Sequence, residues 1–310
     1  MSCFVSEPAG LESTTPSARP GRALKKSEAG EARTYPPVMA PNGAAAVSKV
    51  VEALRLRRRG DGWTGEMPAD VWGQVVFGGF VIAHAVSAGA REAPEGRRLH
   101  SLHAYFLKPV VGGKTIEYRV RTLREGRTFA SRLVEASQDD KPVLSMTCSF
   151  ADDVDGYEYQ PPMPRGMPRP ESVAAESWGP WECAVIGPSV PDENGHYGST
   201  HRMWFRTRAP LPEDEHVATA FTAFATDLTW KGARPLHLDG DTRGIVSIDH
   251  AVWFHRPMRP DRWCYYDVTS VINAGGRGLL RGRMYSDDGL LCVSVAQETL
   301  LTRYEDATPR

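Results

Sequence analysis

The chain has 310 residues, a formal net charge of −1, 41% hydrophobic residues and 24% charged residues. This length suits one large domain or two domains of ordinary size, and the composition is that of a globular protein. The near-zero charge excludes a global electrostatic field that would recruit nucleic acid or an anionic membrane.

Cysteine usage and the two ends of the chain favour an intracellular protein. The five cysteines are far apart and lack the spacing of a metal site or a disulfide framework, so we expect a reducing compartment and no metal. No apolar run reaches the ~18 residues that would predict a membrane span, and the N-terminus lacks a secretory signal pattern. Residues 307–310 do not form the Ser-Lys-Leu peroxisomal address, so the expected location is the cytoplasm.

Two segments of biased composition divide the chain into blocks. Residues 1–45 are rich in Pro, Ser, Ala, Gly and charge, which predicts a disordered arm because such a segment buries too little apolar surface to fold. Residues 152–194 contain a run of prolines and predict a surface linker, pinned by Trp178 and Trp181. The two remaining blocks, each predicted to be a domain, are 46–151 and 195–305.

Each block contains one apolar helical stretch followed by several strands. Residues 75–86 are apolar on nearly all sides, so the helix predicted there must be surrounded by protein. Alternating apolar and polar residues predict the strands of the first block, at 116–123, 129–137 and 143–150. The turns at 138–141 and 286–289 have hairpin composition. A buried helix wrapped by an antiparallel sheet, twice over, is an α+β arrangement.

The two blocks resemble each other when one is shifted by 148 residues along the other. The matching stretches are 101–109 with 248–257, 125–127 with 275–277 after a slip of two residues, and 138–140 with 286–288 at the original offset. Their common order indicates a duplicated domain. The same offset places Asp227 opposite Gly79. It also places Gln297 opposite Ser149, so the two copies differ in their polar chemistry, as a single active site requires.

The most specific motifs are Val-Phe-Gly-Gly at 76–79, Leu-His-Ser-Leu-His-Ala-Tyr-Phe at 99–106, Glu-Gly-Arg-Thr-Phe at 125–129, Gly-Tyr-Glu-Tyr-Gln at 156–160, Ser-Ile-Asp-His-Ala-Val-Trp-Phe-His-Arg-Pro at 247–257 and Ser-Val-Ala-Gln-Glu at 294–298. Together they resemble the acyl-CoA thioesterase II family over roughly residues 60–165 and 200–304. The resemblance implies a tandem (double) hotdog fold, in which each half is an antiparallel sheet wrapped around a long buried helix. It also implies hydrolysis of acyl-CoA to a free acid and CoA, without a metal, a cofactor or a covalent intermediate.

In that family an Asp, a Thr and a Gln of the second half hold the attacking water. The resemblance carries these roles to Asp227, Ser247 and Gln297, with Ser in place of Thr. The apolar neighbours of Asp227, such as Phe224 and Leu228, predict a raised pKa and hence a better base. A thioester has a good leaving group, so a water positioned by Ser247 and Gln297 suffices.

Each of these residues also has a plainer interpretation. Asp227 could cap the N-terminus of a helix, because Asp is favoured there. Gln297 could be a strand residue that faces water, and Ser247 a hydroxyl in a turn. Local sequence alone does not separate these alternatives.

The start of the apolar helix supplies further candidates, as part of an oxyanion site or an acyl pocket. Free N–H groups at Gly78 and Gly79 could bind the oxyanion of the thioester carbonyl, or the glycines could only give room for close packing. The family usually has Gln at the next position, where this chain has Phe80. Together with Ser247, Phe80 indicates a diverged substrate, such as an acyl group on a carrier protein.

Two other interpretations compete with the acyl-CoA thioesterase. The Pro-Leu-His at 235–237 resembles part of a hydratase or dehydratase motif, but the Asp and Asn that should precede it are absent. A non-catalytic acyl-binding module would explain Phe80 but not the retention of Asp227 and Gln297. The arginines at 55–59 could bind CoA phosphates or be a solvated charge run. The expected partner is an acyl-CoA or acyl-carrier thioester, and the resemblance implies pairing into a homo-oligomer and leaves a peroxisomal location open.

Overall fold

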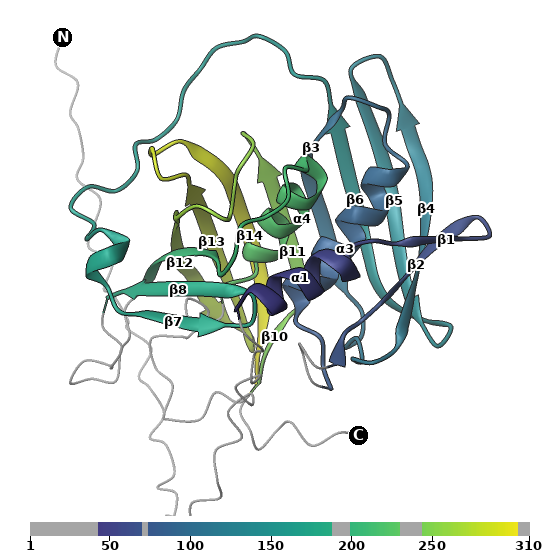
Figure 1. The fold of residues 1–310 in the computed structure, drawn as a ribbon, viewed down its shortest axis with the longest axis horizontal. Coiled ribbons are helices and arrows are strands. Elements are labelled where there is room, and N and C mark those ends of the chain that lie inside the picture. Colours follow the sequence, from purple (N-terminus) through teal and green to yellow (C-terminus); the bar gives the residue numbers. More distant parts are fainter. Residues whose placement is uncertain (1–42, 70–73, 188–198, 230–243, 303–310) are drawn as a thin grey trace, which may run out of the picture. The chain divides into compact units, whose positions relative to one another are not determined.

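The computed structural model describes residues 43–69, 74–187, 199–229 and 244–302, which form one antiparallel sheet and three α-helices (Figure 1). The elements of the first half are α1 (Gly43–Ala53), β1 (Arg57–Arg59), β2 (Gly62–Glu66), α3 (Gly78–Arg91), β3 (Arg98–Phe106), β4 (Thr115–Glu125), β5 (Phe129–Gln138) and β6 (Lys141–Ala151). Those that follow are a 3₁₀ turn η1 (Pro170–Ser172), β7 (Ala175–Trp178), β8 (Trp181–Ile186), β9 (Thr200–Thr207), α4 (Glu215–Ala225), β10 (Gly244–Ser247), β11 (Asp249–Phe254), β12 (Cys264–Ala274), β13 (Arg277–Tyr285) and β14 (Leu291–Thr302). None of the described helices has the length and apolar character needed to cross a membrane.

The sheet is continuous across the two halves. Its strands pair in the order β1-β2-β4-β5-β6-β3-β11-β14-β13-β12-β9-β8-β7, with β10 also paired to β14. The halves meet where β3 pairs with β11, and there Leu102 lies opposite Val252. Both side chains are completely buried, so this junction is part of the hydrophobic core. The predicted α+β tandem hotdog fold is confirmed.

Strand pairing repeats between the halves with a small register change. Ala104 pairs with Met146 in the first half, and Val252 pairs with Val295 in the second. The offset is therefore 148 residues for β3 and β11 but 149 for β6 and β14. Gln297 consequently corresponds to Cys148, and the predicted match with Ser149 is wrong by one position.

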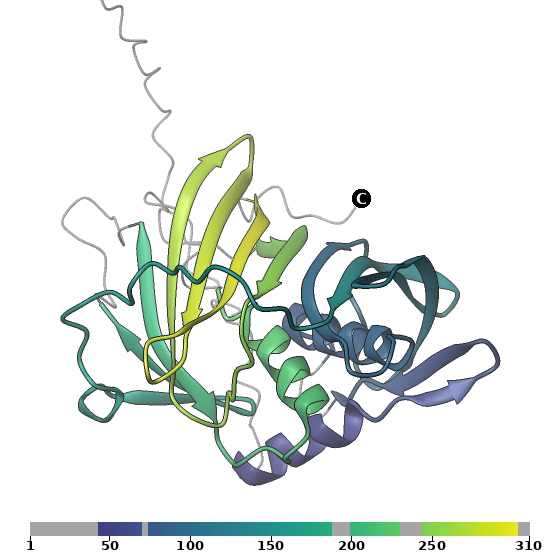
Figure 2. The same ribbon diagram turned by 90° about the horizontal axis from the view of Figure 1, so that it is seen from above.

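The two central helices do not follow the offset of the strands. α3 and α4 each lie in the concave side of one half of the sheet, and α1 lies at their ends (Figure 2). Gly79 is at the start of α3, whereas Asp227 follows the end of α4, so the predicted alignment of these two residues is wrong. The loops that precede α3 and α4 differ in length, so residues of the two helices do not match at the constant offset of 148.

Local chemistry accounts for the ends of the elements. α3 begins three positions later than the apolar run at 75–86, because Val75 and Val76 instead pair with the chain at Val110 and Val111. The strands predicted at 116–123, 129–137 and 143–150 are confirmed as β4, β5 and β6. The β5–β6 turn holds its central residues, 139 and 140, at φ values of 51° and 59°. Positive φ at both positions is the signature of the tight hairpin turn that the sequence predicted.

Part of the segment predicted as a linker joins the sheet. Within 152–194, β7 pairs with β8, and β8 pairs with β9. Trp181 of β8 is fully buried, with its ring 5.0 Å from that of Phe224 in α4. Because the stretch before β7 is rich in proline, a prediction from composition misses this strand pair. Of the predicted arm at 1–45, residues 1–42 lie outside the described residues, and α1 begins at Gly43.

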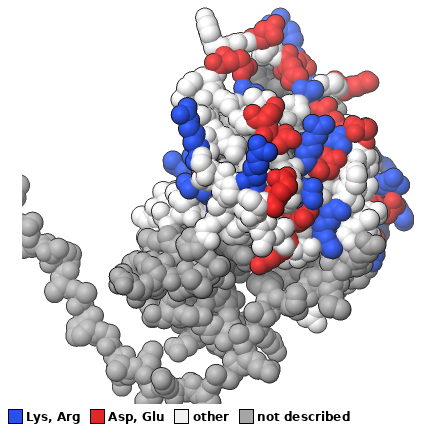
Figure 3. Space-filling model, turned by 60° about the vertical axis from the view of Figure 1, so that its left-hand side comes forward, with Lys and Arg blue, Asp and Glu red and all other residues white. Residues whose placement is uncertain are grey.

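Charged side chains of both signs are interleaved on the surface shown in Figure 3. On β9, β12 and β13 the carboxylate of Asp267 pairs with Arg202 at 3.1 Å and with Arg283 at 3.2 Å. In the arginine run, Arg58 pairs with Glu92 at 2.6 Å and Arg59 with Glu117 at 2.7 Å. These two arginines are largely exposed and paired within their own half, which favours the solvated charge run over a phosphate site.

Candidate active site

Asp227 lies just after the C-terminal end of α4 and is almost completely buried. The helix ends at Ala225 and is capped by Thr226, and the N–H of Asp227 donates to the carbonyl of Phe224 at 3.3 Å. The interpretation of Asp227 as a helix N-cap is therefore wrong. That role belongs to Asp214, whose carboxylate accepts the N–H of His216 at 2.8 Å.

Gln297 reaches Asp227 from β14. Alternate residues of this strand face the core, and Val293, Val295 and Gln297 are all buried. The Gln297 side chain is 0% exposed, so the interpretation as a strand residue facing water is wrong. Its Nε2 donates to Asp227 Oδ1 at 2.6 Å.

A β-bulge turns Ser247 toward the same carboxylate. Val252 and His250 of β11 face the core, so simple alternation would point Ser247 outward. Ser247 pairs with Thr299, whereas Ala251 pairs with Ala296, which leaves one extra residue between β10 and β11. Because the side-chain period is two, the extra residue reverses the direction of Ser247.

Ser247 completes a hydrogen-bonded cluster of the three predicted residues. Its Oγ accepts from Gln297 Nε2 at 2.7 Å and lies 3.3 Å from Asp227 Oδ1, to which it donates. The interpretation of Ser247 as a mere turn hydroxyl does not fit these contacts. The fold thus brings together a carboxylate, an amide and a hydroxyl from α4, β14 and β10.

Sequence reasoning did not single out a fourth buried polar residue, Thr229. Its hydroxyl donates to Gln297 Oε1 at 2.7 Å, and the side chain is 2% exposed. Its position two residues after Asp227 carries no motif of its own. The contact with Gln297 depends on how the turn after α4 packs against β14, which only the folded structure reveals.

The N-terminus of α3 brings the first half into the site. The N–H of Gly79 donates to the carboxylate of Asp227. A methyl group on Gly78 would lie 2.9 Å from Asp227 Oδ2, and one on Gly79 would lie 2.4 Å from the carbonyl oxygen of Phe224. Both glycines thus allow close packing, Gly79 against α4 and Gly78 against the Asp227 carboxylate and the Phe106 ring.

Near neutral pH Asp227 is ionised, but it binds a proton more tightly than an exposed aspartate does. Burial raises its pKa from 3.8 to about 6, opposed by hydrogen bonds from Gln297, Gly79 and Ser247. The negative end of α4 and the positive end of α3 meet at this side chain, and their effects on its charge oppose each other. A carboxylate with a pKa close to neutral is suited to act as a general base.

Neighbouring polar residues secure the end of α4. Tyr266 donates its hydroxyl to the carbonyl of Thr226 at 2.7 Å, and His250 Nε2 lies 2.7 Å from the Thr226 hydroxyl. Burial lowers the pKa of His250 to about 3, so this histidine is neutral at physiological pH. His250 is therefore a buried, neutral residue of the core.

Phe80 packs in the core between α3 and α4. It is 0% exposed, and its ring lies 5.9 Å from that of Phe224 and 5.4 Å from that of His84. The Pro-Leu-His sequence at 235–237 lies outside the described residues. Among those that are described, no group of three or more His, Cys, Asp and Glu side chains is placed to hold a metal ion.

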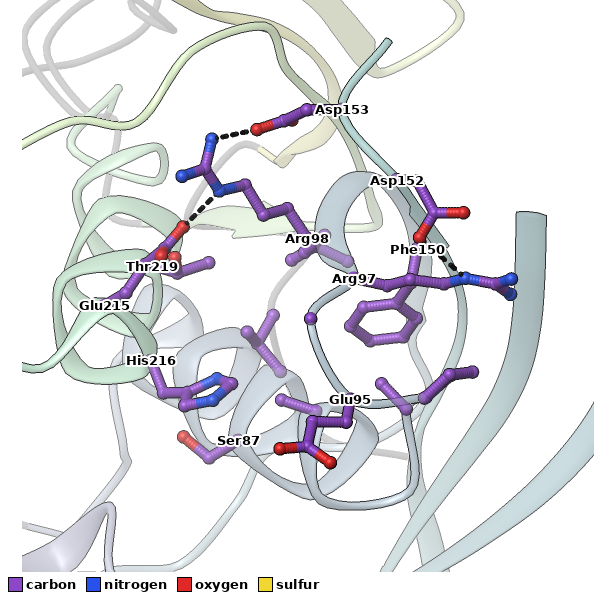
Figure 4. A pocket seen from close by; sticks show the side chains of 16 residues that line it. Ser87, Glu95, Arg97, Arg98, Phe150, Asp152, Asp153, Glu215, His216 and Thr219 are labelled. Atoms are coloured by element: carbon purple, nitrogen blue, oxygen red, sulfur yellow. Dashed lines mark hydrogen bonds and ion pairs between the residues drawn. The ribbon is translucent and has the colours of Figure 1, made fainter. Parts of the chain in front are cut away.

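A cavity of about 380 Å³ lies at the opposite ends of the two central helices (Figure 4). It is lined by the end of α3, including Ser87, and by the start of α4, including His216. Arg98 spans its mouth, with pairs to Glu215 at 2.7 Å and Asp153 at 2.5 Å. This cavity lacks the arrangement of carboxylate, amide and hydroxyl found around Asp227.

Comparison with known proteins places this geometry in a family. Residues 68–151 match the acyl-CoA thioesterase N-terminal domain, and residues 179–300 match the acyl-CoA thioesterase domain. The chain is 31% identical to acyl-CoA thioesterase 2 of Haemophilus influenzae over 280 residues, 82% of this chain and 97% of that protein. It is 28% identical to human acyl-coenzyme A thioesterase 8, over 73% of this chain and 80% of that protein. The crystal structure of an acyl-CoA thioesterase II from Mycobacterium marinum superimposes with a TM-score of 0.73 at 30% identity, covering 82% of this chain and 98% of that one. The chain belongs to the acyl-CoA thioesterase II family of hydrolases.

Proposed function

We propose that the protein hydrolyses acyl-CoA to a free acid and CoA, with a water molecule that Asp227 activates and that Ser247 and Gln297 position. The observation that carries this proposal is the buried carboxylate of Asp227, which has a pKa near 6 and is hydrogen-bonded to both partners. The family membership supports the same substrate class.

The two carboxylate oxygens of Asp227 have different roles. Oδ1 accepts from Gln297 and Ser247, which hold the carboxylate in place and so position the water that Oδ2 binds. Oδ2 faces Gly78 beside the ring of Phe106, and we assign the attacking water and the substrate carbonyl to this side of the carboxylate. Oδ2 takes a proton from the water, and the oxygen of that water attacks the thioester carbon.

Collapse of the resulting tetrahedral species breaks the carbon–sulfur bond. The thiolate leaves and takes up the proton that Asp227 accepted, so the products are a carboxylic acid and a thiol. A thiol of pKa about 8.5 is a good leaving group, which limits the demand on the base. We assign stabilisation of the developing oxyanion to backbone N–H groups at the start of α3.

The test is thiol release from short-, medium- and long-chain acyl-CoAs, followed with a chromogenic disulfide. Asp227→Ala should lower kcat at least about a hundredfold, the scale of a positioned base. Asp267→Ala is the matched control, because Asp267 is also 5% exposed or less but its carboxylate pairs with Arg202 and Arg283 and not with the site residues. Equal activity of the Asp227 variant and the control would exclude the mechanism.

Wild-type protein that releases no thiol from any acyl-CoA would exclude CoA hydrolysis. Hydrolysis of an acyl-carrier thioester would then become the leading function. Binding of acyl-CoA without turnover would instead identify a non-catalytic acyl-binding module, and loss of the enoyl chromophore without thiol release would identify a hydratase.

A further inference from the structure

We propose that Thr229 is a positioning residue that fixes which end of the Gln297 amide faces Asp227. Its effect on catalysis rests on the function proposed above. The Thr229 hydroxyl donates to Gln297 Oε1 at 2.7 Å. The other end of the amide, Nε2, donates to Asp227 Oδ1 at 2.6 Å and to Ser247 Oγ at 2.7 Å.

An amide side chain has two different ends, an oxygen and a nitrogen, and either end can be turned toward a given neighbour. Its oxygen only accepts hydrogen bonds, and its nitrogen only donates them. The carboxylate of Asp227 needs the donor, so the observed orientation is the productive one. A half-turn of the amide would place Oε1 against Asp227 and withdraw both hydrogen bonds that order the site.

The orientation is most at risk when Asp227 is protonated. While Asp227 is ionised, it repels Oε1 and so selects Nε2 without help. A neutral Asp227 whose proton lies on Oδ1, the oxygen that faces Gln297, is a donor and can bond to Oε1 equally well. A hydroxyl already bonded to Oε1 removes this alternative, and Thr229 provides that hydroxyl.

Burial makes the contact effective. Thr229 is 2% exposed, Gln297 is 0% exposed and Asp227 is 4% exposed. In such an environment an unpaired polar group is costly, so each of these groups keeps its partner. The other acceptor near the Thr229 hydroxyl is the carbonyl of Asp227 at 3.5 Å, a much longer contact. The same turn after α4 thus carries both the base and the residue that orients its donor.

The informative variant is Thr229→Val, which keeps the shape of the side chain and removes the hydroxyl. We expect kcat to fall about 3- to 10-fold, the size of one neutral hydrogen bond, with KM unchanged. We also expect the acidic limb of the kcat–pH profile to move to higher pH. A turned amide accepts from protonated Asp227 and thereby stabilises the neutral form of the base.

Two further variants separate positioning from stability. Thr229→Ser retains the hydroxyl and should restore both kcat and the acidic limb. Thr222→Val removes an equally buried hydroxyl from α4, one that bonds only to the carbonyl of Ala218 at 2.8 Å, and should change neither quantity. The proposal is overturned if Thr229→Val matches Thr222→Val in both readouts, or if Thr229→Ser shares the loss.

A measurement without substrate distinguishes this proposal from the function on which it rests. The titration of the Asp227 carboxyl can be followed by carbon NMR with labelled Asp and assigned by its absence in Asp227→Asn. Thr229→Val should raise that pKa, whereas Thr222→Val should not. Full activity in Asp227→Ala and Gln297→Ala would refute the proposed function while leaving this titration result to decide the role of Thr229.

Discussion

At the scale of single residues, the pKa of Asp227 links the proposed chemistry to a measurable pH profile. Burial raises this pKa to about 6, so the carboxyl is mostly ionised above that pH and mostly protonated below it. A general base works only when ionised. We expect kcat to fall tenfold per pH unit below about pH 6, and Asp227→Glu or Gln297→Ala to move this limb. A profile that is flat from pH 5 to pH 8 would contradict the assignment of Asp227 as the base.

The same pKa predicts a cost in stability. In the unfolded chain the carboxyl ionises near 3.8, whereas in the folded protein it ionises near 6. The folded state thus holds the proton more tightly, and its free energy of unfolding falls as pH rises from about 4 to about 6. The full difference is on the order of 3 kcal/mol, at about 1.4 kcal/mol per pKa unit.

Asp227→Asn removes this titration, which gives a second prediction. From pH 4 to pH 6 the free energy of unfolding of wild type should fall by up to about 3 kcal/mol relative to that of the variant. Chemical denaturation at each pH measures both values. Parallel pH dependence of the two proteins would show that Asp227 ionises normally in the folded state.

The paired glycines of α3 predict two different defects. A methyl group on Gly78 would lie 2.9 Å from Asp227 Oδ2, so Gly78→Ala should fold normally and lose activity at least about tenfold, as for a misplaced reacting group. A methyl group on Gly79 would lie 2.4 Å from a backbone carbonyl of α4, so Gly79→Ala should lose about 1–3 kcal/mol of stability. Thermal unfolding beside thiol release measures both. The same defect in both variants would refute this division of roles.

At the scale of elements, periodicity was enough to locate the regular strands and the buried helix. β4, β5 and β6 follow alternating residues, and α3 follows an apolar run. The extra residue between β10 and β11 has no comparable signal, yet it decides the direction in which Ser247 points. The pair β7–β8 follows a proline-rich stretch and depends on Trp181 finding its place against α4.

The packing of α3 on α4 predicts the effect of restoring the residue that the family usually carries after the paired glycines. Phe80 is fully buried against Phe224 and His84. In Phe80→Gln an amide would replace the ring in this apolar setting, at a cost of about 3 kcal/mol or more. We expect a lower Tm and no gain in kcat. Phe80→Leu is the apolar control, and a Gln variant as stable as this control would show that the position is polar.

At the scale of the molecule, the candidate site could be predicted only through the family resemblance. Asp227, Ser247 and Gln297 are distant in sequence, and the local pattern around each also fits a plainer role. Their convergence depends on α4 ending beside β14 and on the bulge before β11. Thr229 was not predicted, because its contact with Gln297 joins elements that no sequence pattern connects.

The site depends on both halves. The first half contributes the backbone N–H of Gly79, and the second half contributes Asp227, Ser247 and Gln297. Among the contacts that join the halves are the β3–β11 pairing, with Leu102 opposite Val252, and the contact between α3 and α4. The covalent connection after β6 runs through exposed residues, with Val154 and Tyr157 at 74% and 109% exposure. We therefore predict that backbone continuity at this point is not needed to assemble the site.

A protease recognition sequence inserted between Val154 and Tyr157 tests this view. After cleavage the two fragments should elute together and keep most of their thiol-release activity, because a buried strand pair and a helix contact still join them. The uncut insertion protein is the control for the insertion itself. Fragments separated in denaturant should each be inactive after refolding alone and regain activity when refolded together, since neither carries the whole site. Separation of the cut protein under native conditions would show that the connecting chain, rather than the shared sheet, holds the halves in register.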